Sequence, residues 1–303
     1  MIRFPKQVRI VEVGPRDGFQ NIKQYIPTET KLSIIAAMVD AGVTLLEVTS
    51  FVHPKAIPQM ADAVEVAETV CGKYQNTALR PIALVPNITG AKKALAAGIQ
   101  EISYVISASE KHNLANINRT HEQSLEDLGK ISKELPELKV RLDVATAFGC
   151  PFSGRVDESL ITKLIDAALK LGIQTVVLCD TIGVADPLLV YQHASKIKAN
   201  YPGLDVGLHL HDTRGMALAN SLAGLEAGIT MFEASVGGLG GCPFAPGAAG
   251  NSATEDLINM LQSMGIETGI SLDKYIAAAT IVREEIQSVL TSRMAYACKY
   301  ENM

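Results

Sequence analysis

Short apolar stretches alternate with amphipathic helical patterns along the whole chain. Eight stretches have the length and composition of buried strands: residues 8–13, 45–50, 81–86, 101–107, 140–148, 175–180, 205–211 and 231–237. The segments between them have helical periodicity, and two of the clearest, 28–42 and 157–172, end on glycine, a common C-terminal stop of helices. One junction recurs four times, as AGVTLLEV, AGIQEISYV, LGIQTVVL and AGITMFEA. Each copy predicts a helix end, a glycine, a short turn and the next strand.

Eight strand–helix units without a break in composition predict an α/β fold, a (β/α)8 TIM barrel that spans residues 1–303 as a single domain. The alternative is an open, doubly wound sheet. No GxGxxG motif follows the first strand, and the count of eight favours the barrel. Residues 271–290 predict additional C-terminal helix, so we expect residues 271–303 to form an appendage that covers a barrel face or takes part in a dimer contact.

Composition narrows the range of partners. The formal net charge is −5 and tryptophan is absent, so we expect no nucleic acid and no anionic membrane as a partner. Hydrophobic residues make up 48% of the chain, but no apolar run has the length of a membrane span. Five scattered cysteines without zinc-type spacing indicate reduced thiols. With the first strand close to Met1, this leads us to expect a cytoplasmic protein without a targeting segment.

Titratable and amide residues gather where the predicted strands end. In a (β/α)8 barrel these ends meet at one face, which is where the chemistry of such barrels takes place. The glycine-rich segment 237–251 follows the eighth strand and has the composition of an active-site loop, although it could be merely flexible. The convergence at one mouth favours an enzyme. The residues concerned are Arg16, Asp17, Glu47, Asp180, His209, His211, Cys242 and Asn251.

Two histidines of the seventh strand indicate a metal site. His209 and His211 lie two residues apart, so they point to the same face of the strand. With Asp17 and Asn251 they offer imidazole, carboxylate and amide ligands for a divalent ion. The alternatives are a cap or turn role for Asp17 and a helix N-cap role for Asn251. Because the set contains no thiolate, we expect Mg²⁺ or Mn²⁺ rather than zinc.

Two further residues suggest chemistry beside this site. The guanidinium of Arg16 suits a carboxylate, a phosphate or a developing enolate oxygen, and its alternative use is an ion pair with Glu47 or Asp180. Cys242 lies in the middle of the glycine-rich segment, where a thiol could deliver or remove a proton. The alternative for Cys242 is a buried, inert thiol.

Several segments together resemble one enzyme family. Five segments resemble, in the same order, the signature segments of 3-hydroxy-3-methylglutaryl-CoA (HMG-CoA) lyases, and the likeness runs from about residue 5 to 290. The segments are VGPRDGFQN, TSFVHPK, DTIG, HLHDTRGMALAN and GGLGGCPFAPGAAGNSATED. These are metal-dependent (β/α)8 lyases related to isopropylmalate synthases. The cysteine-containing segment is the most specific, since the related synthases lack it.

The resemblance implies a lyase that cleaves HMG-CoA, an acyl-CoA substrate, to acetyl-CoA and acetoacetate. It implies Asp17, His209, His211 and Asn251 as metal ligands and Arg16 as the cation that activates the substrate. It also implies Cys242 as acid/base in a mobile loop, and Glu47, Asp180 and Glu255 as supporting catalytic carboxylates. Either an imidazole or Asp180 is the expected base for the substrate hydroxyl.

Some positions depart from the family or extend the expected site. Phe19 stands where leucine is more usual, so we expect it to line the acyl pocket and to affect acyl-chain preference. Gln20 and Asn116 are further expected substrate contacts. Cys298 lies near a position where some relatives carry a regulatory cysteine, and we do not carry that regulation over.

Other functions are compatible with the same residues. A related lyase could act on a bulkier 3-hydroxy-3-alkylglutaryl-CoA, and a Claisen-type synthase would share several of the motifs. A catalytically silent barrel that binds acyl-CoA would retain the pocket without turnover. In each case we expect a homo-oligomer, a dimer being the simplest.

Overall fold

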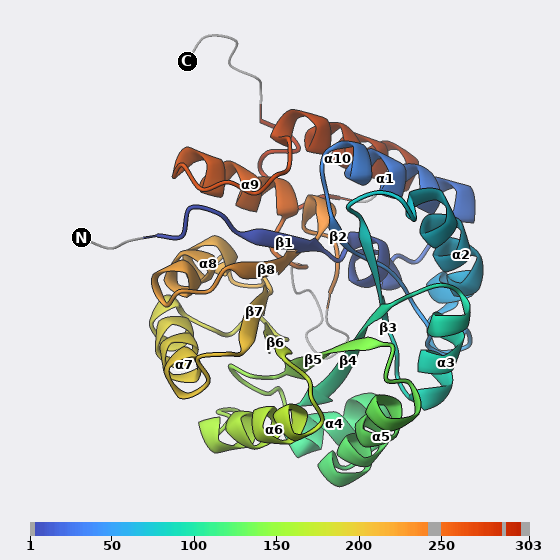
Figure 1. Ribbon diagram of the computed structural model, residues 1–303. Helices are drawn as coiled ribbons and strands as arrows, with labels where there is room; N and C mark the ends of the chain where they lie inside the picture. The colour runs from blue at the N-terminus through green and yellow to red at the C-terminus, as the bar shows by residue number, and fades with distance from the viewer. Residues whose placement is uncertain (1–3, 242–249, 287–288, 298–303) are drawn as a thin grey trace.

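Eight parallel strands form a closed barrel. The computed structural model describes residues 4–241, 250–286 and 289–297. Each strand is hydrogen-bonded to the next in sequence order, and the eighth returns to the first (Figure 1). The predicted (β/α)8 barrel is confirmed. The strands are β1 (Arg9–Glu12), β2 (Leu45–Ser50), β3 (Arg80–Leu84), β4 (Glu101–Ser107), β5 (Lys139–Ala145), β6 (Thr175–Asp180), β7 (Asp205–Leu210) and β8 (Met231–Ala234).

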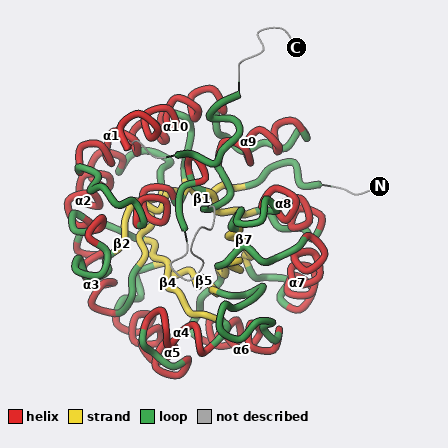
Figure 2. The backbone as a smooth tube through the Cα atoms, turned by 180° about the vertical axis from the view of Figure 1, so that it is seen from behind, coloured by secondary structure: helices red, strands yellow, loops and turns green. Residues whose placement is uncertain are grey.

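The helices form an outer ring around the strands, as Figure 2 shows from the opposite side. Short helical turns, η1 (Gly14–Gly18), η2 (Pro58–Met60) and η3 (Val236–Gly238), lie between some of the larger elements. In the described part of the chain, no helix is both long and apolar enough to cross a membrane. The helices are α1 (Thr28–Asp40), α2 (Ala63–Tyr74), α3 (Ile88–Ala96), α4 (Glu110–Ile117), α5 (His121–Glu134), α6 (Glu158–Lys170), α7 (Pro187–Asn200), α8 (Ala217–Glu226), α9 (Thr254–Ser263) and α10 (Leu272–Ile286).

The recurring glycine junction is a Schellman-type helix end. After α1, the backbone N–H of Val43 donates to the carbonyl of Met38 at 3.1 Å, across Gly42 with φ +102°. This left-handed backbone favours glycine, since a side chain there is strained. After α3, Ile99 donates to the carbonyl of Ala94 at 3.0 Å in the same way. The repeated sequence therefore turns each of these helices back toward the barrel.

Side chains alternate between two apolar layers. One face of each strand packs on the helices in the main hydrophobic core. The other face fills the barrel, where Val11, Leu45, Ile82, Val177 and Met231 belong to one buried cluster. The barrel therefore has a packed interior rather than a pore.

Several strands end earlier than the sequence predicts. β5 ends at Ala145 rather than 148, because Thr146 has a left-handed backbone with φ 56°. β7 ends at Leu210, and His211 instead forms an isolated bridge with Asn251. β8 ends at Ala234, after which Ser235 pairs with the segment before α9. These breaks lie at the carboxyl ends, where the backbone leaves the sheet to form the mouth.

The predicted additional C-terminal helix is present as α10, which is shorter than the predicted 271–290. It packs against α1 and α9 and so occupies a place in the helix ring (Figure 1). The buried face of this helix includes Tyr275, Ala278, Ala279 and Val282. The last helix thus adjoins the first one, on the side where β1 and β8 close the barrel.

The interior layer generates a stability prediction. Ile82 is fully buried among side chains from other strands, so its replacement by alanine leaves a cavity that the closed sheet cannot collapse. We expect Ile82→Ala to lower the free energy of unfolding by about 2 to 4 kcal/mol, measured by denaturant titration. Leu188→Ala, at a position 64% exposed, should change it by about 0.5 kcal/mol or less. Equal losses in the two variants would contradict this packing.

Candidate active site

A tight turn after β1 brings Arg16 and Asp17 to the mouth of the barrel. The carbonyl of Val13 accepts hydrogen bonds from the backbone N–H groups of Asp17 at 2.7 Å and Gly18 at 3.3 Å. The second bond, between residues five apart, gives η1 its π-helical geometry, which occurs preferentially at functional sites. Both side chains are buried, with 7% of each residue exposed. The turn therefore places a cation and an anion side by side under cover.

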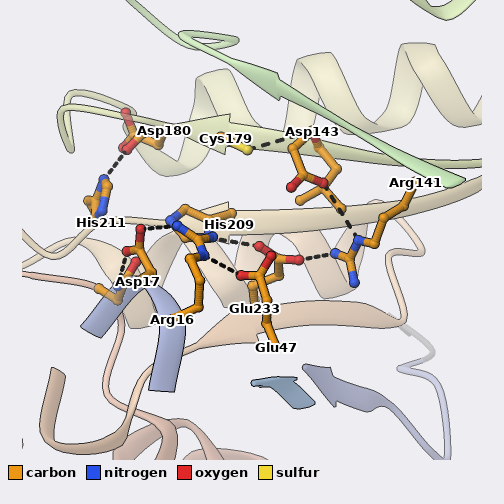
Figure 3. A network of polar contacts seen from close by, with 12 residues as sticks. Arg16, Asp17, Glu47, Arg141, Asp143, Cys179, Asp180, His209, His211 and Glu233 are labelled. Carbon is orange, nitrogen blue, oxygen red and sulfur yellow. Dashed lines mark hydrogen bonds and ion pairs between the residues drawn. The ribbon is translucent and has the colours of Figure 1, made fainter. Parts of the chain in front are cut away.

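The two histidines of the seventh strand unit are each held by one ring nitrogen. His209 Nδ1 lies 2.8 Å from Glu233 Oε2, and His211 Nδ1 lies 2.9 Å from the backbone carbonyl of Asp180 (Figure 3). Because both partners are acceptors, each Nδ1 carries the proton and each Nε2 retains its lone pair. The rings meet edge to face with centroids 5.0 Å apart. This is the arrangement of a pair of metal-ligating imidazoles.

The predicted ligands come together from three parts of the chain. Ligand atoms of Asp17, His209 and His211 all lie within 4.8 Å of one another. Asn251 joins them, since its Nδ2 donates to Asp17 Oδ2 at 2.6 Å and to the carbonyl of Leu239 at 2.9 Å. Asn251 is also fully buried, with 1% exposed.

Two buried atoms at this point have no hydrogen-bond partner among the described residues. They are His211 Nε2 and Asn251 Oδ1, and both offer a lone pair. Buried polar atoms are rarely left without a partner, so such a pair indicates a bound species. With the Asp17 carboxylate, these nitrogen and oxygen donors fit a divalent cation.

The local electrostatics keep the ligands in the required protonation states. Burial by itself raises the pKa of the Asp17 carboxyl, but the neighbouring Arg16 guanidinium and the hydrogen bond from Asn251 lower it, and this pKa is about 2. Burial lowers the pKa of His209 to about 3, and the neighbouring His211 ring adds to the shift. At neutral pH Asp17 is therefore charged and His209 neutral, as metal ligation requires.

Arg16 forms the ion pair with Glu47 that the sequence left open as an alternative. Its Nε donates to Glu47 Oε2 at 2.6 Å, and its Nη1 donates to Asp17 Oδ1 (Figure 3). Burial alone would lower the pKa of Arg16, but the two carboxylates raise it above its usual value. These two contacts hold the guanidinium in place at the mouth.

Three charged residues below the site were missed by the sequence interpretation. Arg141 of β5 forms an ion pair with Glu233 of β8, the carboxylate that holds His209. Arg141 Nε also lies 3.6 Å from Asp143 Oδ1, and burial raises the pKa of Asp143 to about 6. The available signal was the charge alternation inside the predicted strands, in VRLDV and MFEAS. These charges point into the barrel directly beneath its mouth.

The comparisons with known proteins agree with this geometry. The family model described as HMGL-like matches residues 7–282. The chain is 43% identical over 292 residues to hydroxymethylglutaryl-CoA lyase YngG of Bacillus subtilis (strain 168), covering 96% of this chain and 97% of that protein. It is 39% identical over 299 residues to the human mitochondrial hydroxymethylglutaryl-CoA lyase, covering 98% of this chain and 91% of that protein.

Solved structures give the same result. A structure described as an HMG-CoA lyase from Acinetobacter baumannii in complex with coenzyme A and 3-methylmalate has a TM-score of 0.93 and 38% identity, covering 100% of this chain and 99% of that chain. The B. subtilis enzyme has a TM-score of 0.91 at 43% identity, covering 96% of this chain and 97% of that one. The chain belongs to the HMGL-like family. The resemblance seen in the sequence is confirmed.

The carboxylates that the HMGL-like resemblance implies have different surroundings. Glu47 holds Arg16, and its Oε1 is buried without a partner among the described residues. The carboxylate of Asp180 accepts from the backbone N–H groups of Val184 at 2.9 Å and Ala185 at 3.0 Å, while its carbonyl holds His211. Asp180 therefore orders the loop after β6 and orients a histidine through its main chain, and its role as a base stays a prediction.

Glu255 contacts the glycine-rich segment. Both of its carboxylate oxygens lie 3.1 Å from the backbone N–H of Gly237, and burial raises its pKa to about 7. Glu255 thus supports the first residues of that segment from α9. Cys242 lies outside the described residues, and so does Cys298.

The expected substrate contacts of the first loop and α4 differ in exposure. Gln20 is half-buried, and its Nε2 lies 3.4 Å from Asp17 Oδ1, beside the ligand group. Asn116 is exposed on α4. Phe19 is fully buried in the main hydrophobic core, so its side chain does not line an open pocket. Contact of Phe19 with an acyl chain is a prediction that this packing does not support.

The histidine–carboxylate contact generates a prediction about metal affinity. Glu233→Gln keeps the shape of the side chain but removes the charge that orients His209 and pairs with Arg141. We expect the dissociation constant for Mn²⁺ to rise by about 10- to 100-fold, measured by equilibrium dialysis. Glu134→Gln, which breaks only the exposed contact with Lys92, is the matched control and should leave Mn²⁺ binding unchanged. Unchanged binding in the Glu233 variant would argue against His209 as a ligand.

Proposed function

We propose that this chain is a divalent-metal-dependent carbon–carbon lyase that cleaves HMG-CoA to acetyl-CoA and acetoacetate. The observation that carries the proposal is the cluster of Asp17, His209 and His211 at the barrel mouth, within 4.8 Å of one another, in a chain of the HMGL-like family. The named relatives support the substrate, and the relative in complex with coenzyme A supports an acyl-CoA.

The proposed ligands of Mg²⁺ or Mn²⁺ are Asp17, His209, His211 and Asn251. When bound, such a cation supplies Lewis-acid stabilisation of negative charge on a substrate oxygen and fixes the orientation of the substrate. Glu233 and the carbonyl of Asp180 keep the two Nε2 atoms directed at the site. The ligand geometry is thus set before substrate arrives, which reduces reorganisation during the reaction.

The reaction breaks the O–H bond of a tertiary alcohol and one carbon–carbon bond. The electron pair of the broken carbon–carbon bond passes to the thioester as an enolate, and acetoacetate leaves as the ketone. The Arg16 guanidinium is the proposed donor to this developing negative charge, since Glu47 and Asp17 hold it in place at the mouth. Protonation of the enolate carbon then gives acetyl-CoA.

Two proton transfers complete the reaction. The candidate bases for the hydroxyl proton are an imidazole and Asp180. Because both Nε2 atoms are proposed ligands and both Nδ1 atoms donate to acceptors, we favour the Asp180 carboxylate. Cys242 is the proposed acid for the enolate carbon, on the basis of its place in the glycine-rich segment.

Metal removal tests the reaction directly. Chelator-treated protein should release no acetoacetate from HMG-CoA, and addition of Mg²⁺ or Mn²⁺ should restore the release, because the ligand set without a cation leaves the substrate oxygens unstabilised. Acetoacetate is measured by a coupled hydride-transfer assay. Metal binding without release of acetoacetate would contradict HMG-CoA as the substrate. The same assay with bulkier 3-hydroxy-3-alkyl analogues tests for a related lyase, and the assay run in the condensation direction tests for a synthase. Acyl-CoA binding without any turnover would indicate a silent barrel.

The fork geometry of Arg16 generates a second prediction. Arg16→Lys keeps the charge but loses the paired N–H groups, so we expect kcat for HMG-CoA cleavage to fall by about 10²- to 10³-fold. Arg9→Lys is the matched control, because Arg9 makes a comparable two-point contact with Asp205 at the opposite end of the barrel, at 2.6 and 3.1 Å. Its kcat should stay within about twofold of the unsubstituted enzyme. Equal losses would assign the effect to stability.

The choice of metal, a homodimeric assembly and a cytoplasmic location are parts of the proposal that rest on the sequence. The ligand types favour Mg²⁺ or Mn²⁺. Unpaired cysteines favour a reducing compartment, and Cys71, Cys150 and Cys179 are free thiols in the described part of the chain.

A further inference from the structure

A buried carboxylate on the outer side of β1 accepts four hydrogen bonds. Glu12 is fully buried, and its Oε1 accepts from the backbone N–H groups of Gly14 at 2.7 Å and Val236 at 3.0 Å. Its Oε2 accepts from Thr254 Oγ1 at 2.5 Å and from the hydroxyl of Tyr275. A carboxylate has about four lone-pair directions, and all of them are used here. Glu12 is not among the residues that the sequence singled out.

Three of the four donors belong to segments that build the proposed metal site, and the fourth belongs to the last helix. Gly14 begins η1, which carries Asp17, and Val236 begins η3, which leads into the glycine-rich segment. Thr254 begins α9, three residues after the proposed ligand Asn251. Tyr275 comes from α10, which lies beside α1 on the side of the barrel where β1 and β2 lie (Figure 1). One carboxylate therefore joins the starts of three site-forming segments to the last helix.

The contacts leave little room for adjustment. A Cβ at Gly14 would lie 2.5 Å from Glu12 Oε1, so only glycine allows the backbone to approach this closely. A buried carboxylate is costly unless its hydrogen bonds are made, and each donor that is lost leaves an unsatisfied lone pair. The carboxylate thus fixes the separation of its donors rather than merely touching them.

The separation matters because the proposed ligand Asp17 lies in η1 and the proposed ligand Asn251 lies three residues before α9. They touch through one hydrogen bond, of 2.6 Å between Asn251 Nδ2 and Asp17 Oδ2, although they lie 234 residues apart in sequence. A small displacement of η1 against α9 would open this contact. Metal ligands are sensitive to such shifts, because the groups that orient them contribute strongly to affinity.

We propose that Glu12 and Tyr275 are positioning residues of the metal site, through which the C-terminal helix sets the contact between Asp17 and Asn251. The Tyr275 hydroxyl holds the Glu12 carboxylate, and the carboxylate holds η1 against the start of α9. Neither residue touches the ligands. The inference rests on the proposed function for the identity of the site as a metal centre.

The test measures Mn²⁺ affinity of the full-length chain, with thermal unfolding as a parallel readout. Tyr275→Phe removes only the hydroxyl, and we expect the Mn²⁺ dissociation constant to rise by about three- to tenfold, the range of one lost hydrogen bond. Glu12→Gln replaces one acceptor by a donor and should raise it by about tenfold or more. Free Mn²⁺ is followed by electron paramagnetic resonance.

Tyr104→Phe is the matched control. Tyr104 is also a buried tyrosine, and its hydroxyl donates to a carboxylate, Asp127 Oδ2 at 3.1 Å, but it lies on β4 away from the donors of Glu12. We expect a comparable fall in the melting temperature for Tyr104→Phe and Tyr275→Phe, with weaker Mn²⁺ binding only in the latter. Should Glu12→Gln fail to fold, the pair of tyrosine variants still decides the question.

Two outcomes would overturn the inference. In the first, Tyr275→Phe binds Mn²⁺ as tightly as the unsubstituted chain does, or its binding is weakened only as much as that of Tyr104→Phe. Glu12 and Tyr275 would then contribute to general stability only, and the proposed function would stay intact. Absence of Mn²⁺ binding in the unsubstituted chain would instead remove the metal site itself, and the inference with it.

Discussion

The pairing of β1 with β8 is the interaction on which the site depends. Four consecutive residue pairs join these strands, from Arg9 with Met231 to Glu12 with Ala234, and they close the barrel between the two ends of the chain. Closure brings the turn after β1, with Asp17, next to the segment that begins at Gly250 and carries Asn251. Neither segment has a complete set of ligands. A single register shift along this seam would separate the carboxylate from the amide, and a slip of one residue would also turn the strand's side chains to the other face.

The closed barrel also encloses charged side chains, and among the described residues their ion pairs leave an excess of negative charge. In the ion-paired network beneath the mouth, Arg16 and Arg141 face four carboxylates, so the formal charge with neutral histidines is −2. The carboxylates are Asp17, Glu47, Asp143 and Glu233, and 7% or less of each residue is exposed. Uncompensated buried charge is strongly unfavourable, whereas a divalent cation would neutralise this network. The ligand geometry and the charge balance therefore support the same occupant for different physical reasons.

The local pattern of the sequence was sufficient to predict the barrel and the cluster of Asp17, His209 and His211. Eight apolar stretches define the strands, and the topology then brings all carboxyl ends to one face, so residues after different strands can be grouped without knowing any contact. The prediction failed to identify residues whose importance lies in a distant partner. The role of Glu233 depends on its contact with Arg141, 92 residues earlier, and the role of Glu12 on its contact with Tyr275, 263 residues later. Alternation along a strand shows that two faces exist, but not which charge on either face finds a partner.

The polar groups on the outer side of the barrel wall fix the ends of the glycine-rich segment, while those inside hold the ligand set. At one end the carbonyl of Gly237 accepts from the backbone N–H of Thr291 at 2.9 Å, next to the contact between Gly237 and Glu255. At the other end the carbonyl of Gly250 accepts from the N–H of Asp212 at 2.9 Å. Both ends are thus anchored next to the proposed ligands, since Asp212 follows His211 and Glu255 lies four residues after Asn251. Anchoring of the segment ends and placement of the cluster therefore depend on the same parts of the chain.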